Sequence, residues 1–307
     1  MKDRMDFSVP ARGEGAPLPR ELTRRQALER LGAGALLALG LWPGAIQARA
    51  KSGSRPFRFI VVNDTHYMSD DCGAWLEGVV RQMRQEQPEF CLLAGDLTER
   101  GQREHLASVR DIFSGLGVPT FVQIGNHDYL ADSAGFVAQK PPEPLVSPRD
   151  PRAATPSRSR PIGKWFYSAG DRTSYVKLFP GRLNYRFEHC GWQFVGLDSS
   201  EGNFYQNTEI QPHTLRWLDE HLGRLDRAKP TVIFTHFPLG ARVRYRPNNA
   251  DAVLERFREF NLRAVFSGHF HGFTERQAGQ ITLTTNKCCA LKRANHDGTK
   301  ERGFFVC

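Results

Sequence analysis

The chain has 307 residues, of which 40% are hydrophobic and 11% aromatic, and it carries a formal net charge of +9. A chain of this length and composition can bury a substantial core, which excludes an intrinsically disordered protein and suits one large domain after an N-terminal segment. The positive charge favours anionic ligands without identifying one. A basic, solvated surface is an equally good explanation for most of it.

The N-terminal segment, residues 1–50, contains the features of an export signal in the usual order. The pair Arg24-Arg25 precedes an uncharged stretch, residues 31–47, and Ala-Arg-Ala follows at residues 48–50. A basic N-terminal region, an apolar run and small residues at the cleavage site are typical of a cleaved signal peptide. The uncharged stretch is too short and too rich in glycine to span a bilayer comfortably, which predicts no stable membrane anchor.

This segment resembles a twin-arginine export signal, although Ala27 and Glu29 depart from the usual residues of that pattern. The resemblance implies recognition by the twin-arginine translocation machinery and a mature domain, residues 51–307, that is periplasmic or extracellular. Twin-arginine substrates typically cross already folded, which suits a protein that acquires metal ions before export. An amphipathic N-terminal helix with an incidental arginine pair is the alternative interpretation.

Five apolar, strand-like runs of the chain each end on residues that can bind a metal ion. A buried strand has no need of carboxylates, amides or imidazoles at its end, so the repetition indicates one shared site. In open α/β folds such a site lies at the carboxyl edge of a sheet. The runs end in turn on Asp64 and His66, on Asp96, on Asn126 and His127, on His236, and on His269 and His271.

Segments with helical spacing of apolar residues lie between these runs, over residues 76–83, 106–116, 215–225 and 253–260. The middle of the chain differs, because two extended runs flank Cys190-Gly191 in the pattern of a hairpin followed by a strand. We therefore predict an α/β protein with two halves rich in β-α units, whose sheets pack together with helices outside. Residues 302–307 also resemble a strand, which either continues beyond the chain or closes the second sheet.

Residues 138–165 interrupt this order with seven prolines and four arginines. Such a composition opposes regular structure and predicts a long surface insertion. Because the insertion follows His127 and Asp128 closely, its arginines stand near the expected site, where they would meet an anionic substrate; a solvated loop is the alternative. The four arginines are Arg149, Arg152, Arg158 and Arg160.

The six cysteines show no spacing typical of a metal-binding ribbon. Cys91 lies within a strand-like run, which predicts a small buried apolar residue. An oxidising compartment would permit disulfides that involve Cys72 or Cys190, but the spacing assigns no pair.

The residues at the ends of the runs form five short motifs. The motifs are Asp64-Thr65-His66, Gly95-Asp96 with Gly101, Gly125-Asn126-His127-Asp128, His236 after an apolar run, and Gly268-His269-Phe270-His271. In this order they resemble the signature of the calcineurin-like metallophosphoesterase superfamily. The resemblance extends from Phe57 to about His271 and leaves out the proline-rich insertion. It implies an α/β fold, a four-layer α-β-β-α sandwich of two packed mixed sheets.

Two divalent metal ions close together need roughly eight protein donors if each takes about four. The ends of the runs offer seven such residues, one fewer than this number. A carboxylate that binds both ions would count twice and supply the eighth donor. By resemblance Asp96 is that bridge. The resemblance also implies that the first ion is bound by Asp64, His66 and His271, and the second by Asn126, His236 and His269. Nitrogen and oxygen donors without thiolates suit Mn, Fe or Zn alike.

His127 has no metal ion in this assignment. The resemblance gives His127 the role of protonating the leaving oxygen or binding the developing charge, with Asp128 as a possible orienting partner.

Five further histidines lack ligand spacing and are expected at the surface, whereas three arginines after His236 either contact an anionic substrate or form a solvated face. These residues are His105, His189, His213, His221 and His296, and Arg242, Arg244 and Arg246.

The resemblance implies a dinuclear metal-dependent phosphoester hydrolase in which a hydroxide held by both ions attacks phosphorus. Residues 95–101, GDLTERG, lack the form associated with protein serine/threonine phosphatases and the tyrosine of purple acid phosphatases. By elimination, the expected substrate is a small anionic phosphodiester such as a cyclic nucleotide. The alternatives are a phosphomonoesterase and an exported metal-binding protein of this fold without turnover. Scattered basic residues without interleaved aromatics argue against a nucleic-acid partner.

Overall fold

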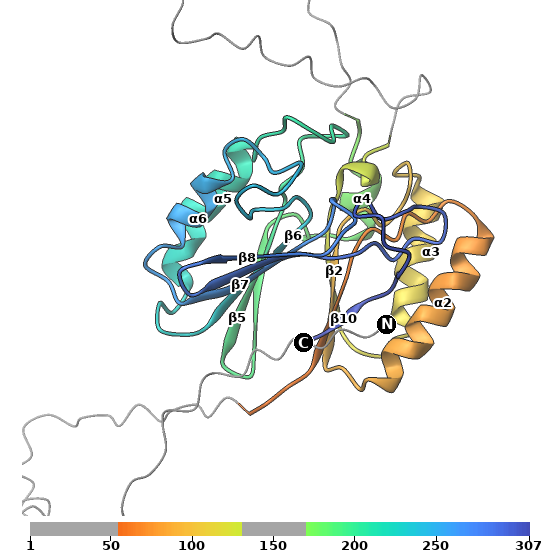
Figure 1. Cartoon of the computed structure of the whole chain (residues 1–307), viewed down its shortest axis with the longest axis horizontal. Helices are drawn as coiled ribbons and strands as arrows, with labels where there is room; N and C mark the ends of the chain where they lie inside the picture. Colours follow the sequence, from red (N-terminus) through yellow and green to blue (C-terminus); the bar gives the residue numbers. More distant parts are fainter. Residues whose placement is uncertain (1–54, 131–169) are drawn as a thin grey trace, which may run out of the picture. The chain divides into compact units, whose positions relative to one another are not determined.

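The computed structural model describes residues 55–130 and 170–307, so the expected export signal and the proline-rich insertion lie outside the described residues. The described part contains two β-sheets packed face to face, with helices on their outer faces (Figure 1). This is the four-layer α-β-β-α arrangement that the sequence predicted. None of the described helices is long and apolar enough to cross a membrane.

The first sheet has four strands in the order β10-β1-β2-β3. Strands β1 (Phe59–Val62), β2 (Phe90–Ala94) and β3 (Thr120–Gln123) are parallel, and β10 (Phe305–Val306) pairs antiparallel with β1. Every residue of β1 and β2 is buried, as expected for parallel strands covered on both faces. Because β10 extends the first sheet, the expectation that the last residues close the second sheet was wrong.

The second sheet has six strands in the order β4-β5-β6-β7-β9-β8. Its four central strands, β5, β6, β7 and β9, are parallel to one another, and the edge strands β4 and β8 are antiparallel. The hairpin predicted at Cys190-Gly191 joins β4 to β5, and both turn residues have positive φ angles, of 44° and 81°. The strands are β4 (Tyr185–His189), β5 (Trp192–Leu197), β6 (Thr231–Thr235), β7 (Leu262–Ser267), β8 (Thr274–Ala278) and β9 (Ile281–Thr285).

Helices α2 (Asp70–Gln85) and α3 (Arg103–Ser114) cover the first sheet, and α5 (Pro212–His221) and α6 (Asp251–Arg256) cover the second (Figure 1). Each helix turns its apolar stripe inward, as Leu76 of α2 and Leu218 of α5 show, both fully buried. The short helix α4 (Thr173–Leu178) packs against α3. Helix α5 gives way to a 3-10 turn, η2 (Leu222–Arg224), and α6 stops at Arg256, so both are shorter than the spacing predicted.

Aromatic side chains fill the space between the two sheets. The ring of Phe59 on β1 lies 5.7 Å from Phe194 on β5 and 5.9 Å from Phe266 on β7, in edge-to-face contact. Phe90 on β2 contacts Phe194 in the same manner at 5.1 Å. Each buried ring contributes roughly 1.5–3 kcal/mol through burial alone. This packing holds the carboxyl ends of the parallel strands of both sheets in a fixed relation.

All six cysteines are free thiols, so the disulfides considered for Cys72 and Cys190 are not formed in this structure. Cys91 is fully buried in β2, as the sequence predicted. Burial raises the pKa of the Cys91 thiol, which keeps it protonated and unreactive.

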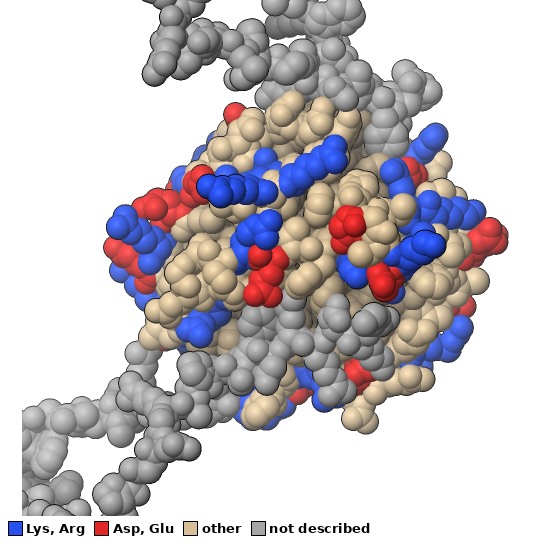
Figure 2. Space-filling model, in the orientation of Figure 1, with Lys and Arg blue, Asp and Glu red and all other residues tan. Residues whose placement is uncertain are grey.

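Lysine and arginine side chains on the face shown in Figure 2 are interspersed with aspartate and glutamate instead of forming one continuous basic patch. Elsewhere in the described residues, charged side chains pair with each other, for example Arg256 with Asp219 at 2.7 Å and Lys229 with Glu188 at 2.7 Å. Exposed pairs of this kind contribute little to stability, typically less than about 1 kcal/mol each.

Candidate metal centre

The carboxyl ends of β1, β2, β3, β6 and β7 bring the seven sequence-predicted ligands into one cluster. Each residue follows its strand directly or within a few residues, and the side chains come from both sheets. Their side chains lie against one another although the chain positions span more than two hundred residues. The seven buried residues are Asp64, His66, Asp96, Asn126, His236, His269 and His271.

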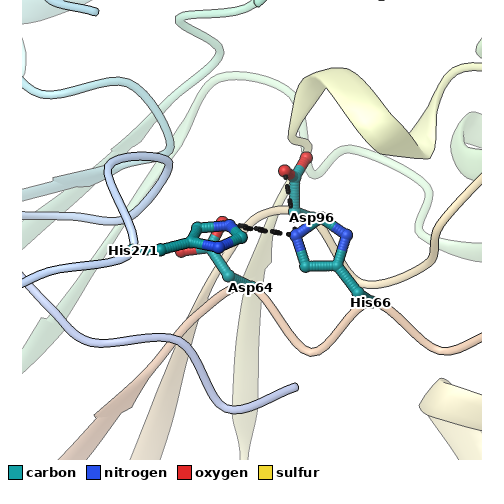
Figure 3. A group of neighbouring side chains, drawn as sticks. All are labelled: Asp64, His66, Asp96 and His271. Carbon is teal, nitrogen blue, oxygen red and sulfur yellow. Dashed lines mark hydrogen bonds and ion pairs between the residues drawn. The ribbon is translucent and has the colours of Figure 1, made fainter. Parts of the chain in front are cut away.

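Four of these residues form a first group, Asp64, His66, Asp96 and His271, whose ligand atoms lie within 4.8 Å of one another (Figure 3). Nε2 of His66 lies 3.1 Å from Nε2 of His271 and 3.6 Å from Oδ2 of Asp96. Nε2 of His271 lies 3.2 Å from Oδ1 of Asp64. Two carboxylates and two imidazoles therefore point at one small volume.

A second group lies on the other side of Asp96. Nε2 of His236 is 3.3 Å from Oδ1 of Asp96, 3.1 Å from Nδ1 of His269 and 3.2 Å from Oδ1 of Asn126. Asp96 thus turns Oδ2 toward the first group and Oδ1 toward the second. This is the placement that a bridging carboxylate requires.

Each of the four histidines directs one ring nitrogen into the cluster and the other to an oxygen acceptor. Nδ1 of His66 lies 3.1 Å from the Glu99 carboxylate. The three backbone acceptors are the carbonyl oxygens of Ala94 for Nδ1 of His236, Tyr205 for Nε2 of His269 and Ala294 for Nδ1 of His271. Metal-binding histidines are held in the same way, because the outer hydrogen bond fixes the tautomer and leaves the inner nitrogen unprotonated.

The donor geometry fits metal ions. With the outer nitrogens donating to oxygen, the inner nitrogens of His66 and His271 face each other as lone pairs at 3.1 Å, as do those of His236 and His269. Such contacts are repulsive unless a proton or a metal ion lies between the two nitrogen atoms. Two nitrogen atoms that bind one ion at 2.0–2.1 Å are roughly 3 to 3.4 Å apart, which agrees with both separations.

The charges of the cluster also favour a cation. Burial would lower the pKa of His236 and His271, but the Asp96 and Asp64 carboxylates outweigh it and raise the two pKa values to about 9 and about 11. Buried carboxylates therefore draw positive charge into the site, and metal ions can supply it in place of these protons.

The backbone at the ligands is strained. Five of the ligands have positive φ angles between 42° and 63°, a region that costs a residue other than glycine about 1–3 kcal/mol. Strain of this kind persists only where the surrounding fold imposes it, and it is concentrated at functional sites. The five are Asp64, His66, Asp96, His269 and His271.

Glycines allow the loops to approach the cluster. A Cβ atom at Gly125 would lie 2.1 Å from Oδ1 of Asp96, and one at Gly268 would lie 2.5 Å from Oδ2 of Asp64. Neither distance can be tolerated, so both positions require glycine for close approach of the backbone.

His127 lies at the edge of the cluster in the 3-10 turn η1 (Asn126–Asp128). Its backbone N–H donates to Oδ1 of Asp96 at 2.9 Å, and its ring packs edge-on against His66 with centroids 4.7 Å apart. Nδ1 of the ring lies 2.9 Å from the carbonyl oxygen of Glu99. The proton-transfer chemistry expected of His127 therefore falls to Nε2.

Asp128 has a different position from the one the sequence suggested. Its buried carboxylate accepts hydrogen bonds from the backbone N–H groups of Gly125 at 2.9 Å and Thr98 at 3.0 Å. It thereby ties the loop after β2 to the loop after β3, while the carbonyl of Glu99 holds the His127 ring. Burial and the nearby Asp96 carboxylate raise the pKa of Asp128 to about 7.

Sequence reasoning missed several residues that contact the cluster. Glu99 lies 3.1 Å from Nδ1 of His66 and also forms a two-point ion pair with Arg293, whose Nε lies 3.0 Å from Oε2. His296, expected only as a surface residue, stacks on His271 with centroids 4.9 Å apart. Glu99 could have been noticed from its place three residues after Asp96, whereas nothing in the sequence singles out Arg293 or His296.

The other four histidines of the surface group are half-buried and have structural contacts. His189 lies 2.8 Å from the Glu89 carboxylate, and His213 lies 3.1 Å from that of Asp198. His221 stacks on Trp217, and His105 packs near Tyr67. These side chains are partly exposed, as expected of surface residues, but each also has a contact that the sequence did not predict.

Comparison with known proteins agrees with this geometry. Residues 57–273 match the calcineurin-like phosphoesterase family. The chain is 24% identical over 243 residues to a glycerophosphodiester phosphodiesterase of Enterobacter lignolyticus, covering 73% of this chain and 74% of that protein. It is 26% identical over 228 residues to a probable cyclic nucleotide phosphodiesterase of Synechococcus, covering 68% and 71%. A dimetal phosphatase from Danio rerio shares the fold, with 16% identity, a TM-score of 0.51 and coverage of 76% and 87%.

Proposed function

Because this chain belongs to the calcineurin-like phosphoesterase family and is therefore a metallophosphoesterase, we propose that it hydrolyses a small phosphodiester at a centre of two metal ions. The observation that carries the proposal is the common arrangement of the four histidines, each with one nitrogen fixed by an outer oxygen and the other directed inward. The proposed first-ion ligands are Asp64, His66 and His271, the proposed second-ion ligands are Asn126, His236 and His269, and Asp96 is shared.

When bound, two such ions would activate water and neutralise charge on the phosphoryl oxygens. The chain's own residues would supply the rest. Nε2 of His127 would donate a proton to the leaving oxygen, with the ring oriented by the Glu99 carbonyl. Asp128 would keep the two loops that carry Asp96 and Asn126 in register through its backbone hydrogen bonds.

A diester is favoured over a monoester because the two relatives described above are named as a phosphodiesterase and a probable phosphodiesterase. A cyclic nucleotide is one candidate among the small diesters. A metal-binding protein without turnover is the competing function. The position of His127 argues against it, since a purely structural metal site needs no ring oriented beside the cluster.

The test is turnover by the purified mature protein loaded with Mn²⁺, Fe²⁺ or Zn²⁺. Hydrolysis of bis(p-nitrophenyl) phosphate should exceed that of p-nitrophenyl phosphate, and a chelator should abolish both. Asp96→Asn is the control variant, because a neutral amide compensates two cations less well than a carboxylate, so bound metal and turnover should fall together. Two tightly bound ions without hydrolysis of any diester would favour the binding protein instead.

Export is a separate part of the proposal. The signal-like residues 1–50 support recognition by the twin-arginine machinery and a periplasmic or extracellular location for residues 51–307. A small anionic phosphoester would then be the only other partner we propose.

A further inference from the structure

A rim of aromatic rings lies directly outside the proposed ligands, in the loop after β6 and in the segment after β5. The Tyr245 ring packs edge-on against the ring of His269 with centroids 5.3 Å apart. The same ring lies 6.2 Å from Tyr205 and 6.1 Å from His296, which in turn stacks on His271. Tyr245 therefore contacts a proposed ligand of the second ion directly, and it is linked to a proposed ligand of the first ion through His296.

Arg244 adds a planar cation to this rim. Its guanidinium lies over the Tyr245 ring at 4.6 Å from the centroid, and its side chain is exposed. Within residues 55–130 and 170–307 it has no acidic partner, in contrast to Arg246, which pairs with Asp251. An unpaired, weakly hydrated guanidinium stacked on tyrosine presents a second flat surface for a ligand.

The fold fixes this rim in place. Arg246 donates through Nε to the Leu239 carbonyl at 2.9 Å, and Val243 is buried beneath the loop. Tyr245 is held with a positive φ of 66°, a strained conformation for an aromatic residue. The backbone that carries Arg244 and Tyr245 is therefore held in place by the fold.

We propose that Arg244, Tyr245 and Tyr205 form a subsite for a planar ring carried by the phosphodiester, such as a nucleobase or an aryl group. This inference rests on the proposed function. The single charge of a diester would be compensated at the metal centre, so the rim is left to contact the esterified groups. Tyrosine rings and arginine planes recognise flat rings by stacking, which is largely independent of base identity.

The test compares three esters with the same leaving group and the same single charge: thymidine 5′-(p-nitrophenyl) phosphate, phenyl p-nitrophenyl phosphate and methyl p-nitrophenyl phosphate. Tyr245→Leu and Arg244→Ala should each raise KM for the thymidine ester roughly fivefold or more, the effect of losing one stacked partner. The nitrophenyl group is common to all three esters and would leave beside His127, so the methyl ester has no second flat ring for the subsite. Its KM should therefore stay the same, and kcat should change little. The phenyl ester shows which kind of ring the subsite binds. If its KM rises as much as that of the thymidine ester, the subsite accepts any flat ring. If its KM rises less, the subsite is specific for a nucleobase.

Arg242→Ala is the matched control, because it removes an exposed arginine of the same loop that is not stacked on Tyr245. It should leave all three KM values unchanged. Equal rises for the methyl and thymidine esters in the Arg244 variant would show that Arg244 acts by charge alone and would overturn the proposal. Unchanged KM values in both test variants would overturn it as well.

Turnover of the methyl ester by the wild-type protein tests the proposed function. The ratio of the variant's KM to the wild-type KM for each ester tests the subsite. The proposed function and the subsite can therefore fail separately. Calorimetric titration of the metal-loaded protein with thymidine 5′-monophosphate gives a readout without turnover. Its Kd should rise roughly fivefold or more in Tyr245→Leu and Arg244→Ala. A Kd equal to that of the wild type in both variants, with metal content unchanged, would refute the subsite.

Discussion

Replacement of Glu99 by alanine should weaken one of the two proposed metal sites selectively. The Glu99 carboxylate lies 3.1 Å from Nδ1 of His66, and its side chain is only 16% exposed. No other acceptor in the described residues lies at this nitrogen, so the variant would leave the ring without its fixed tautomer. The ligands assigned to the second ion have their own outer acceptors and should be unaffected.

The expected loss of metal affinity in Glu99→Ala follows from the contacts of Glu99 with His66 and with Arg293. Loss of an outer partner of a metal-binding histidine typically lowers metal affinity 10- to 100-fold, which is about 1.4–2.7 kcal/mol. Glu99 also neutralises Arg293 through a two-point ion pair, so the variant leaves an uncompensated guanidinium near the cluster. Repulsion between this group and a bound cation places the expected loss in the upper part of that range.

The assay is calorimetric titration of metal-free protein with Mn²⁺ or Zn²⁺. We expect one weakened and one unchanged binding step in Glu99→Ala, together with lower turnover. Glu77→Ala is the control, because it removes an equal charge from an exposed position on α2, 60% exposed and paired only weakly with Arg81. Wild-type affinity for both ions in Glu99→Ala would refute the reasoning, as would equal weakening of both steps.

Three further predictions concern catalysis, packing and export. His127→Asn should retain two bound ions and lower kcat by roughly 10²- to 10⁴-fold, with a smaller loss for better leaving groups; an equal loss for nitrophenolate and alkoxide esters would argue against acid catalysis. Gly125→Ala should lose bound metal, measured by elemental analysis, because its Cβ would lie 2.1 Å from Oδ1 of Asp96; a variant with full metal content would contradict this. Replacement of Arg24 and Arg25 by lysine should leave an unprocessed cytoplasmic precursor on immunoblots of cell fractions, and unchanged processing would exclude the twin-arginine route.

The sequence alone was sufficient to predict that one site gathers the residues at the ends of five apolar runs. Buried strands are recognisable from their composition, and polar residues at their ends stand out because the core has no use for them. Parallel strands end at a common edge, so residues such as Asp64 and Asp96 had to lie close together. The four-layer fold and the hairpin at Cys190-Gly191 followed from the same local patterns.

Only the tertiary structure showed what surrounds this cluster. The pairing of β10 with β1, the contact of Arg293 with Glu99 and the stacking of His296 on His271 join residues far apart in the chain. Arg293 and His296 lie in an irregular segment without a repeating pattern, and the path of such a segment depends on packing against distant elements. The sequence by itself therefore determined which residues form the cluster, because strand ends are a local property. Tertiary packing decided which residues orient those ligands and form the rim, because these contacts depend on loops whose course no local rule describes.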